Sequence, residues 1–307
     1  MEVFDYKTER SENTILINTK NWLKNDSNLI QEYRISGKAV INGLTEVLDV
    51  YDFLPPLQGY LKKGDKVLLS KVASQISNYY AYAINGKKEY HSIPIMQVLG
   101  VFKDGHISLD SLSMLFDKIL IKKINPRYNT YLDLPEDNTT VGVVIKTGNK
   151  RFNSKWEEQP LTVKEGDVVL IRDNVSTPIN FEGEEYLATE EGMVVGVFEN
   201  KEALNIDGLR VLNKYILMKP FTFSNLLNSN LLITPNINYA DLDYSDVYNP
   251  NLFIVLYMDE KLTFVKKYDI VIVDRNITNY VYFNNDRYFV INDESSVEGV
   301  WQQTLDE

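Results

Sequence analysis

The stretch VKEGDVVLIRDN, residues 163–174, determines how the rest of the chain can be interpreted. It predicts a turn at Gly166-Asp167 followed by a buried strand, because four apolar residues follow the aspartate without interruption. Two similar stretches occur, LKKGDKVLLSKV at 61–72 and VKKYDIVIVDRN at 265–276. Their aspartates, Asp65, Asp167 and Asp269, are separated by two equal steps of 102 residues. The equal spacing predicts an internal repeat.

The segments around these stretches repeat as well. Each has a hairpin-like segment with Asn, Gly or Asp at its turn, at 84–93, 181–189 and 283–291. Each then closes on an apolar segment, VLGVF at 98–102, VVGVF at 194–198 and VEGVW at 297–301. The sequence therefore predicts three tandem domains, 1–107, 108–206 and 207–307, joined by the polar linkers 103–111 and 200–208.

The turn before the repeated strand differs in the third unit. Gly64 and Gly166 precede the aspartate in the first two units, whereas Tyr268 takes that place in the third. Glycine adopts a positive φ without steric cost, and tyrosine does not. We therefore expect Gly64-Asp65, Gly166-Asp167 and Asp269 to form a repeated turn scaffold, whose third copy cannot rely on glycine.

Each unit is expected to be all-β. The apolar runs are four to eight residues long, are rich in Val, Ile, Leu and Tyr, and are bounded by Gly, Asn and Asp. Such runs at this spacing favour a small barrel or sandwich, and runs such as VVLI predict strands that are covered on both faces.

The second unit resembles the GroES-type co-chaperonin family. LFDKILIKK at 115–123 is similar to the opening strand of that family, VGVVIKTGNKRF at 141–152 to its second segment, and PLTVKEGDVVLIRDN at 160–174 to its third. FEGEEYLATEEGMVVGVF at 181–198 is similar to its closing pattern. The first and third units match the later half of this pattern better than the earlier half. The resemblance implies three irregular GroES-like β-barrels.

The resemblance also implies a partner-binding loop between the first two strands, tipped by an apolar triplet. In the third unit Leu231, Leu232, Ile233 and Thr234 are similar to that tip, and an ordinary buried strand is the alternative interpretation. In the second unit the corresponding loop carries Asp133 inside the expected tip, and the first unit offers only Leu29 and Ile30. Rings of this family have seven subunits, and seven positions cannot be filled by chains of three units each without leaving units over.

Composition narrows the set of partners. With 43 acidic and 32 basic residues the net charge is −11, which disfavours a phosphate backbone as a partner. Cysteine is absent, which excludes disulfides and thiolate chemistry and fits a reducing compartment. No signal peptide and no apolar run long enough to span a bilayer are visible. We therefore expect protein partners, no direct nucleic acid, no membrane, and a location in a virion or the bacterial cytoplasm.

Nothing in the sequence indicates an enzyme. His91 and His106 are the only histidines, and the other units have none at the corresponding positions. Asp241, Asp243 and Asp246 could bind a hard cation, but their spacing does not match an EF-hand and an acidic solvated loop explains them as well. We expect no catalytic residue, no metal site and no cofactor.

Two functions remain open. In the first, which the repetition favours, the chain is a structural subunit of a ring or shell in a bacteriophage particle, built from co-chaperonin-like barrels. In the alternative, it is a divergent multi-barrel co-chaperonin that caps a chaperonin ring and assists the folding of client proteins such as a capsid protein.

Overall fold

The structure is a computed structural model of the 307-residue chain. It describes residues 14–18, 33–35, 38–40, 44–51, 57–70, 81–84, 87–103, 106–124, 141–172, 176–181, 183–201, 204–221, 251–273, 279–284 and 286–301. In these ranges regular structure consists of β-strands and short 3-10 helices. The predicted all-β class is confirmed.

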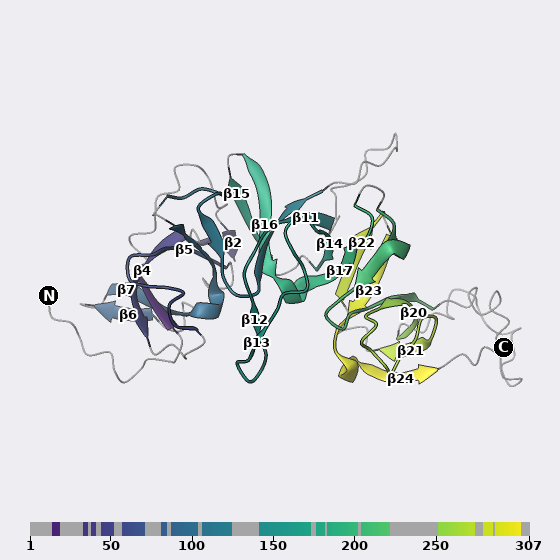
Figure 1. The fold of residues 1–307 in the computed structure, drawn as a ribbon. Coiled ribbons are helices and arrows are strands. Elements are labelled where there is room, and N and C mark those ends of the chain that lie inside the picture. Colours follow the sequence, from purple (N-terminus) through teal and green to yellow (C-terminus); the bar gives the residue numbers. More distant parts are fainter. Residues whose placement is uncertain are drawn as a thin grey trace, which may run out of the picture. The chain divides into compact units, whose positions relative to one another are not determined.

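The first sheet has seven strands in the order β6-β7-β1-β4-β5-β8-β9 (Figure 1). Their bounds are β1 Thr14–Asn18, β4 Leu44–Tyr51, β5 Lys66–Leu69, β6 Ala81–Ile84, β7 Lys87–Pro94, β8 Val98–Phe102 and β9 Leu112–Met114. A separate two-stranded sheet pairs β2 (Tyr33–Ile35) with β3 (Lys38–Val40).

The second sheet also has seven strands, in the order β15-β16-β10-β11-β14-β17-β18. Their bounds are β10 Lys118–Lys123, β11 Val141–Thr147, β14 Val168–Ile171, β15 Thr177–Phe181, β16 Glu184–Glu190, β17 Val194–Phe198 and β18 Leu209–Val211. A short hairpin of β12 (Arg151–Phe152) and β13 (Glu158–Gln159) lies between β11 and β14 in the chain.

The third sheet has six strands in the order β22-β23-β19-β20-β21-β24. Their bounds are β19 Ile216–Pro220, β20 Leu252–Met258, β21 Ile270–Val273, β22 Asn279–Phe283, β23 Asp286–Ile291 and β24 Val297–Trp301. A 3-10 turn precedes the closing strand of every sheet: η3 (Ile95–Gln97), η6 (Glu191–Met193) and η10 (Glu294–Ser296).

The three sheets share one connection pattern, since strands in equal chain order take equal places in each sheet. Even an irregularity recurs. The pairing with the closing strand shifts register after Leu68, Leu170 and Ile272, which are also 102 residues apart. The 102-residue step of the sequence therefore corresponds to a repeated strand topology.

The boundaries of the predicted domains stay a prediction. By compactness the chain divides into two units, and the division passes through the second sheet. One unit comprises Met1–Ile124, Gly142–Val168 and Asp173–Met193, and the other comprises Asn125–Val141, Val169–Arg172 and Val194–Glu307. The predicted linkers lead directly into β9 and β18, and each of these strands pairs with the closing strand of the preceding sheet.

The repeated strands supply much of the core. All four residues of β14 are buried, so the expectation of a strand covered on both faces is confirmed there. In β21 the expectation is wrong at one position, because Ile272 is 41% exposed. Leu68 and Leu170, its counterparts in β5 and β14, are fully buried.

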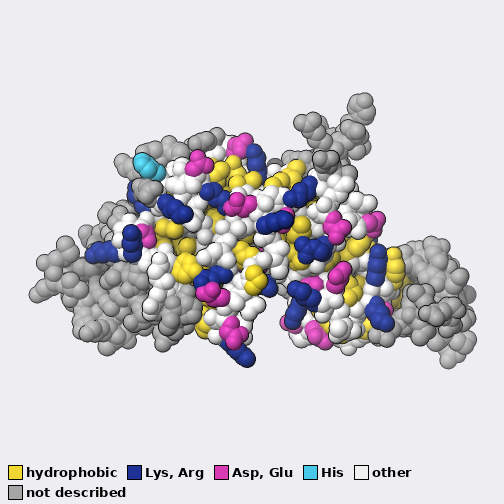
Figure 2. All heavy atoms as spheres, viewed as in Figure 1, with side chains coloured by type: hydrophobic (Ala, Val, Ile, Leu, Met, Phe, Trp, Pro, Cys, Tyr) yellow, Lys and Arg dark blue, Asp and Glu magenta, His cyan; other side chains and the backbone are white. Residues whose placement is uncertain are grey.

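No helix in the described part of the chain is long and apolar enough to cross a membrane. On the face shown in Figure 2, lysine and arginine side chains are interspersed with aspartate and glutamate.

Candidate partner-binding site

The predicted contact loop follows the first strand of the third sheet. Leu231, Leu232, Ile233 and Thr234 lie outside the described residues, as do the three aspartates at 241, 243 and 246. The strands that flank the loop are described: β19 and β20 pair antiparallel, with Pro220 opposite Phe253. The Phe221 amide donates a hydrogen bond of 2.9 Å to the Leu252 carbonyl, so the two ends of the loop lie next to each other.

The other sheets have a long connection in the same place. In the second sheet β10 and β11 pair with Lys123 opposite Gly142, and the segment between them contains Asp133. In the first sheet β1 pairs with β4, and the segment between them contains Leu29 and Ile30. Both of these tip regions lie outside the described residues. In each sheet, the two ends of a candidate loop thus lie on neighbouring strands that pair with each other.

The turns at Gly64-Asp65, Gly166-Asp167 and Tyr268-Asp269 share one set of hydrogen bonds. The aspartate carboxylate accepts from a backbone amide three residues earlier: Asp65 from Lys62 at 2.8 Å, Asp167 from Lys164 at 3.0 Å and Asp269 from Lys266 at 2.8 Å. Each aspartate amide donates in return to the carbonyl of the same lysine. The side chain thereby closes the turn locally.

The residue before each aspartate joins the turn to the second long strand of its sheet. Gly64, Gly166 and Tyr268 donate their amides to the carbonyls of Val47, Val144 and Val255 at 2.8, 2.8 and 2.7 Å. All three adopt a positive φ, of 89°, 82° and 74° respectively. Tyr268 therefore takes the same left-handed conformation as the two glycines, although its Cβ makes that conformation costly.

A buried carboxylate fixes the chain after the β12–β13 hairpin. Glu191, which is fully buried, accepts hydrogen bonds from the Thr162 amide, from the Thr162 hydroxyl at 2.7 Å and from the Val163 amide at 3.2 Å. Arg151 of β12 contacts the other carboxylate oxygen at 3.5 Å. At the same point of the other 3-10 turns, η3 has Ile95, which carries no carboxylate, and η10 has Glu294, which is exposed, so the buried carboxylate belongs to the second sheet.

A buried lysine stands at the start of β10. Lys118 is 1% exposed, and its ammonium group contacts Asp117 and Glu190 at 2.9 Å each. Both carboxylates stay in contact with solvent, since their side chains are 23% and 48% exposed. The ion pairs therefore compensate the one charge that is removed from water.

An aromatic cluster packs the β12–β13 hairpin against the first sheet. Tyr60, Phe116, Phe152 and Trp156 follow one another with ring centroids 4.8, 5.7 and 5.8 Å apart. Lys150 lies 5.3 Å from the centroid of Tyr60, and its ion pair with Glu158 raises its pKa. Sequence reasoning missed this cluster because its members are distant in the chain and have no common period.

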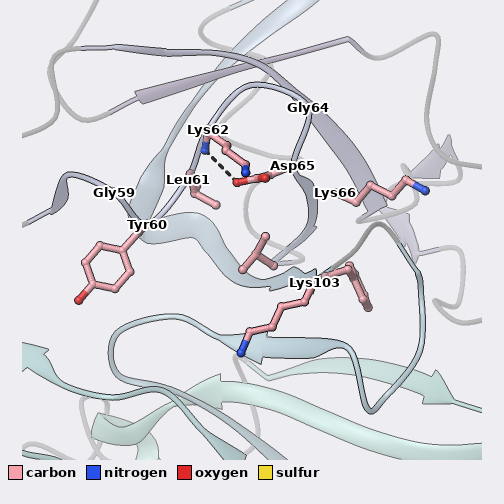
Figure 3. A pocket seen from close by; sticks show the side chains of 10 residues that line it. Gly59, Tyr60, Leu61, Lys62, Gly64, Asp65, Lys66 and Lys103 are labelled. Atoms are coloured by element: carbon pink, nitrogen blue, oxygen red, sulfur yellow. Dashed lines mark hydrogen bonds between the residues drawn. The ribbon is translucent and has the colours of Figure 1, made fainter.

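A hollow with a volume of about 530 Å³ lies beside the Gly64-Asp65 turn of the first sheet. Figure 3 shows the Asp65 carboxylate turned back to the Lys62 amide, while the side chains of Lys66 and Lys103 extend away from it. No group of three or more metal-ligating side chains occurs among the described residues. His106 is exposed, and His91 lies in β7. This hollow has the lysines of an anion site but not the buried, convergent donors.

Together these features define a class: all-β proteins whose sheets repeat one strand order and one turn. Comparison with known proteins gives the family. The chaperonin 10 kDa subunit family matches residues 111–198. Co-chaperonin GroES of Neorickettsia sennetsu is 32% identical over 94 residues, which cover 29% of this chain and 96% of the relative. The co-chaperonin GroES of a Methylovorus species is 33% identical over 98 residues, with 30% and 93% covered.

A third relative, co-chaperonin GroES of Wolbachia sp. subsp. Brugia malayi, is 36% identical over 92 residues, which cover 29% of this chain and 96% of the relative. Nearly the full length of these relatives is thus contained in one third of the chain. The chain belongs to the GroES co-chaperonin family, as the resemblance of its second unit implied.

Proposed function

We propose that the chain is a co-chaperonin that binds a chaperonin ring through the loops between the first two strands of its sheets. The observation that carries this proposal is the near-complete coverage of GroES co-chaperonins by residues around 111–198. The position of the candidate loops supports it, because each loop starts and ends on paired neighbouring strands. A rigid base of this kind holds an extended contact segment in one place.

The comparisons favour this alternative over a structural role in a bacteriophage particle, for which they offer no support. They also support a non-enzymatic role, since the relatives are named co-chaperonins. The relatives come from bacteria, which fits the bacterial cytoplasm as the location. We further propose that each of the three sheets belongs to one GroES-like domain.

The proposed contact is Leu231 to Thr234 in the third loop. Burying the side chains of Leu232 and Ile233 against an apolar surface contributes about 1.5–3 kcal/mol each. Replacing both with serine should therefore weaken binding to an ATP-loaded chaperonin by on the order of 100-fold or more. Binding is measured by co-sedimentation with the chaperonin, and by inhibition of its ATPase activity.

The matched control lies in the same loop. Leu226→Ser with Leu227→Ser removes two apolar side chains of similar size, and we expect it to leave chaperonin binding unchanged. Equal losses in both double variants would show that the loop needs apolar character in general and that 231–234 is not the contact. If the unmodified protein neither binds the chaperonin nor changes its ATPase activity, the proposed function is wrong.

A further inference from the structure

A second hollow is lined by residues of η3, β8, β10, β15, β16 and η6, all within one compact unit of the chain. Its volume is about 210 Å³. Its walls combine four apolar side chains with the ion pair described above, and these six residues are Met96, Leu99, Ala188, Met193, Lys118 and Glu190. A mainly apolar hollow with a few fixed polar groups is typical of a ligand site. We refer to it as the Lys118 cavity.

The ammonium group of Lys118 gives this cavity a buried hydrogen-bond donor. The side chain is only 2% exposed, and it donates to Asp117 and to Glu190 at 2.9 Å each. An ammonium group can donate three hydrogen bonds. No group in the described part of the chain accepts a third one from Lys118. A ligand that carries an acceptor would therefore complete the hydrogen bonding of this ammonium group.

The neighbouring charges determine which kind of acceptor fits. Two carboxylates already face one ammonium group, so the formal charge around Lys118 is negative. A carboxylate or phosphate on the ligand would add a further like charge, which is unfavourable at short range. A neutral carbonyl oxygen accepts the same hydrogen bond without this repulsion. The rest of the ligand should be aliphatic, because it would contact Leu99 and the two methionines, whose flexible side chains adapt to irregular shapes.

The next repeat shows that the fold does not require a lysine and a serine at this place. Lys118 and Tyr215 are equivalent, since each donates its amide to the carbonyl of the leucine three residues earlier, at 2.9 and 3.0 Å. Ser70 and Arg172 are equivalent as well, since each directly follows the repeated strand. Burial raises the pKa of Tyr215, and the positive charge of Arg172 opposes that rise. Larger side chains thus hold both positions in the next repeat.

We propose that the Lys118 cavity binds a small uncharged carbonyl compound with a branched aliphatic group, such as the amide of an aliphatic amino acid. Its carbonyl oxygen accepts a hydrogen bond from Lys118, and its aliphatic group packs against Met96, Leu99 and Met193. The space suffices for such a group, since an apolar cavity of about 150 Å³ binds benzene. The inference does not rest on chaperonin binding, because the free chain tests it.

The test uses N-acetyl-leucine amide as the probe and the full chain with isotope-labelled methionine methyl groups. NMR spectra are recorded during the titration, and signals are assigned by replacing single methionines with leucine. The signals of Met96 and Met193 should shift together. The signal of Met218, which lies in the core of the third sheet, should stay in place.

Two matched probes separate the contributions to binding. N-acetyl-asparagine amide has a similar shape but a polar end, and N-acetyl-leucine carries a carboxylate. We expect each of them to bind about tenfold more weakly or worse, the first because less apolar surface is buried and the second because like charges meet.

Three variants localise the binding. Ser70→Met should fill the cavity and weaken binding of N-acetyl-leucine amide by about tenfold or more, because an overpacked site resists an added group. Lys118→Met should weaken it by about tenfold, because a hydrogen bond to a charged donor is lost. Ser154→Met is the matched control in the exposed part of the β12–β13 hairpin, and it should leave binding unchanged.

Four results would overturn the proposal. These are unshifted signals of Met96 and Met193, equal shifts with all three probes, tighter binding of the anionic N-acetyl-leucine, and undiminished binding in Ser70→Met. If one of the two cavity variants does not fold, the other decides whether the probe occupies the Lys118 cavity.

Discussion

The positive φ of Tyr268 leads to a prediction whose sign depends on the backbone alone. A left-handed conformation costs a residue with a Cβ about 1–2 kcal/mol, while glycine loses about 0.5–1 kcal/mol of backbone entropy on folding. The difference favours glycine by about 1 kcal/mol. We therefore expect the Tyr268→Gly variant to be more stable than the Tyr268→Ala variant by about that amount. Both variants lose the same ring, so its contact with Lys267, 5.1 Å from the ring centroid, cancels.

The neighbouring positions provide matched controls. At Gly64 and Gly166 a Cβ would have nothing within 4 Å, so alanine there should cost only the backbone strain, again about 1 kcal/mol. Lys267 does not adopt a positive φ. There the order should reverse, with Lys267→Ala more stable than Lys267→Gly by about 0.5–1 kcal/mol.

The assay must report on the third sheet, because a chain with several sheets need not unfold in one step. Trp301 lies in β24 of that sheet, so fluorescence during thermal unfolding is a suitable signal in a background that carries Trp22→Phe and Trp156→Phe. A change of 1 kcal/mol shifts the midpoint of a domain of this size by about 4–8 °C. If Tyr268→Ala is as stable as Tyr268→Gly, or if Lys267 shows the same order as Tyr268, the reasoning from φ is refuted.

Three further predictions concern the second sheet. Glu191→Ala should destabilise the second sheet by about 3 kcal/mol, because the amides of Thr162 and Val163 lose their acceptor. Glu191→Gln should cost less stability, and hydrogen exchange of the two amides measures the effect of each variant. In chemical unfolding, Glu190→Gln should lower the free energy of unfolding more than Lys118→Met does, because only Glu190→Gln leaves the buried Lys118 ammonium with fewer partners. The opposite order would contradict the role given to Lys118. Hydrogen bonds from a lysine and a tyrosine lower the pKa of Glu184 below its usual 4.5, so its stabilising effect is present above that pH and is lost as the pH falls through the folded value. The stability of Glu184→Gln should accordingly change less than that of the unmodified protein in unfolding experiments on acidification.

Much of the architecture was predictable because the repeated turns are separated by a constant step. The constant step between Asp65, Asp167 and Asp269 identified equivalent strands, and the hairpins expected at 181–189 and 283–291 are present as β15–β16 and β22–β23. Each aspartate determines its turn through its own carboxylate, so the signal is local in sequence. The sequence predicted that the third turn cannot rely on glycine, but it did not show which backbone conformation Tyr268 adopts. The structure gives Tyr268 the same positive φ as the two glycines, within the same hydrogen bonds.

Other features could not be predicted because their causes lie between distant segments. β9 and β18 have only three residues each, too few to show a strand period, and exist as strands because a closing strand offers an edge. Likewise, the burial of Glu191 depends on a segment about thirty residues earlier in the chain. The candidate loop Leu231–Thr234 stays a prediction from sequence, supported by the pairing of the strands on either side.

β9 and β18, which pair with the closing strands β8 and β17, have a consequence for the synthesis of the protein and for the choice of fragments to express. A ribosome releases a chain from its N-terminus, and domains generally fold in that order. The outer edge of β8 in the first sheet can nevertheless pair only after residues 112–114 have been synthesised. The outer edge of β17 in the second sheet likewise requires residues 209–211. Fragments that stop at the predicted boundaries of 107 or 206 would leave those edges bare, and bare edges favour aggregation. Expressed fragments of this protein should therefore continue through Leu115 or Leu212, the residues whose amides complete the covered ladders.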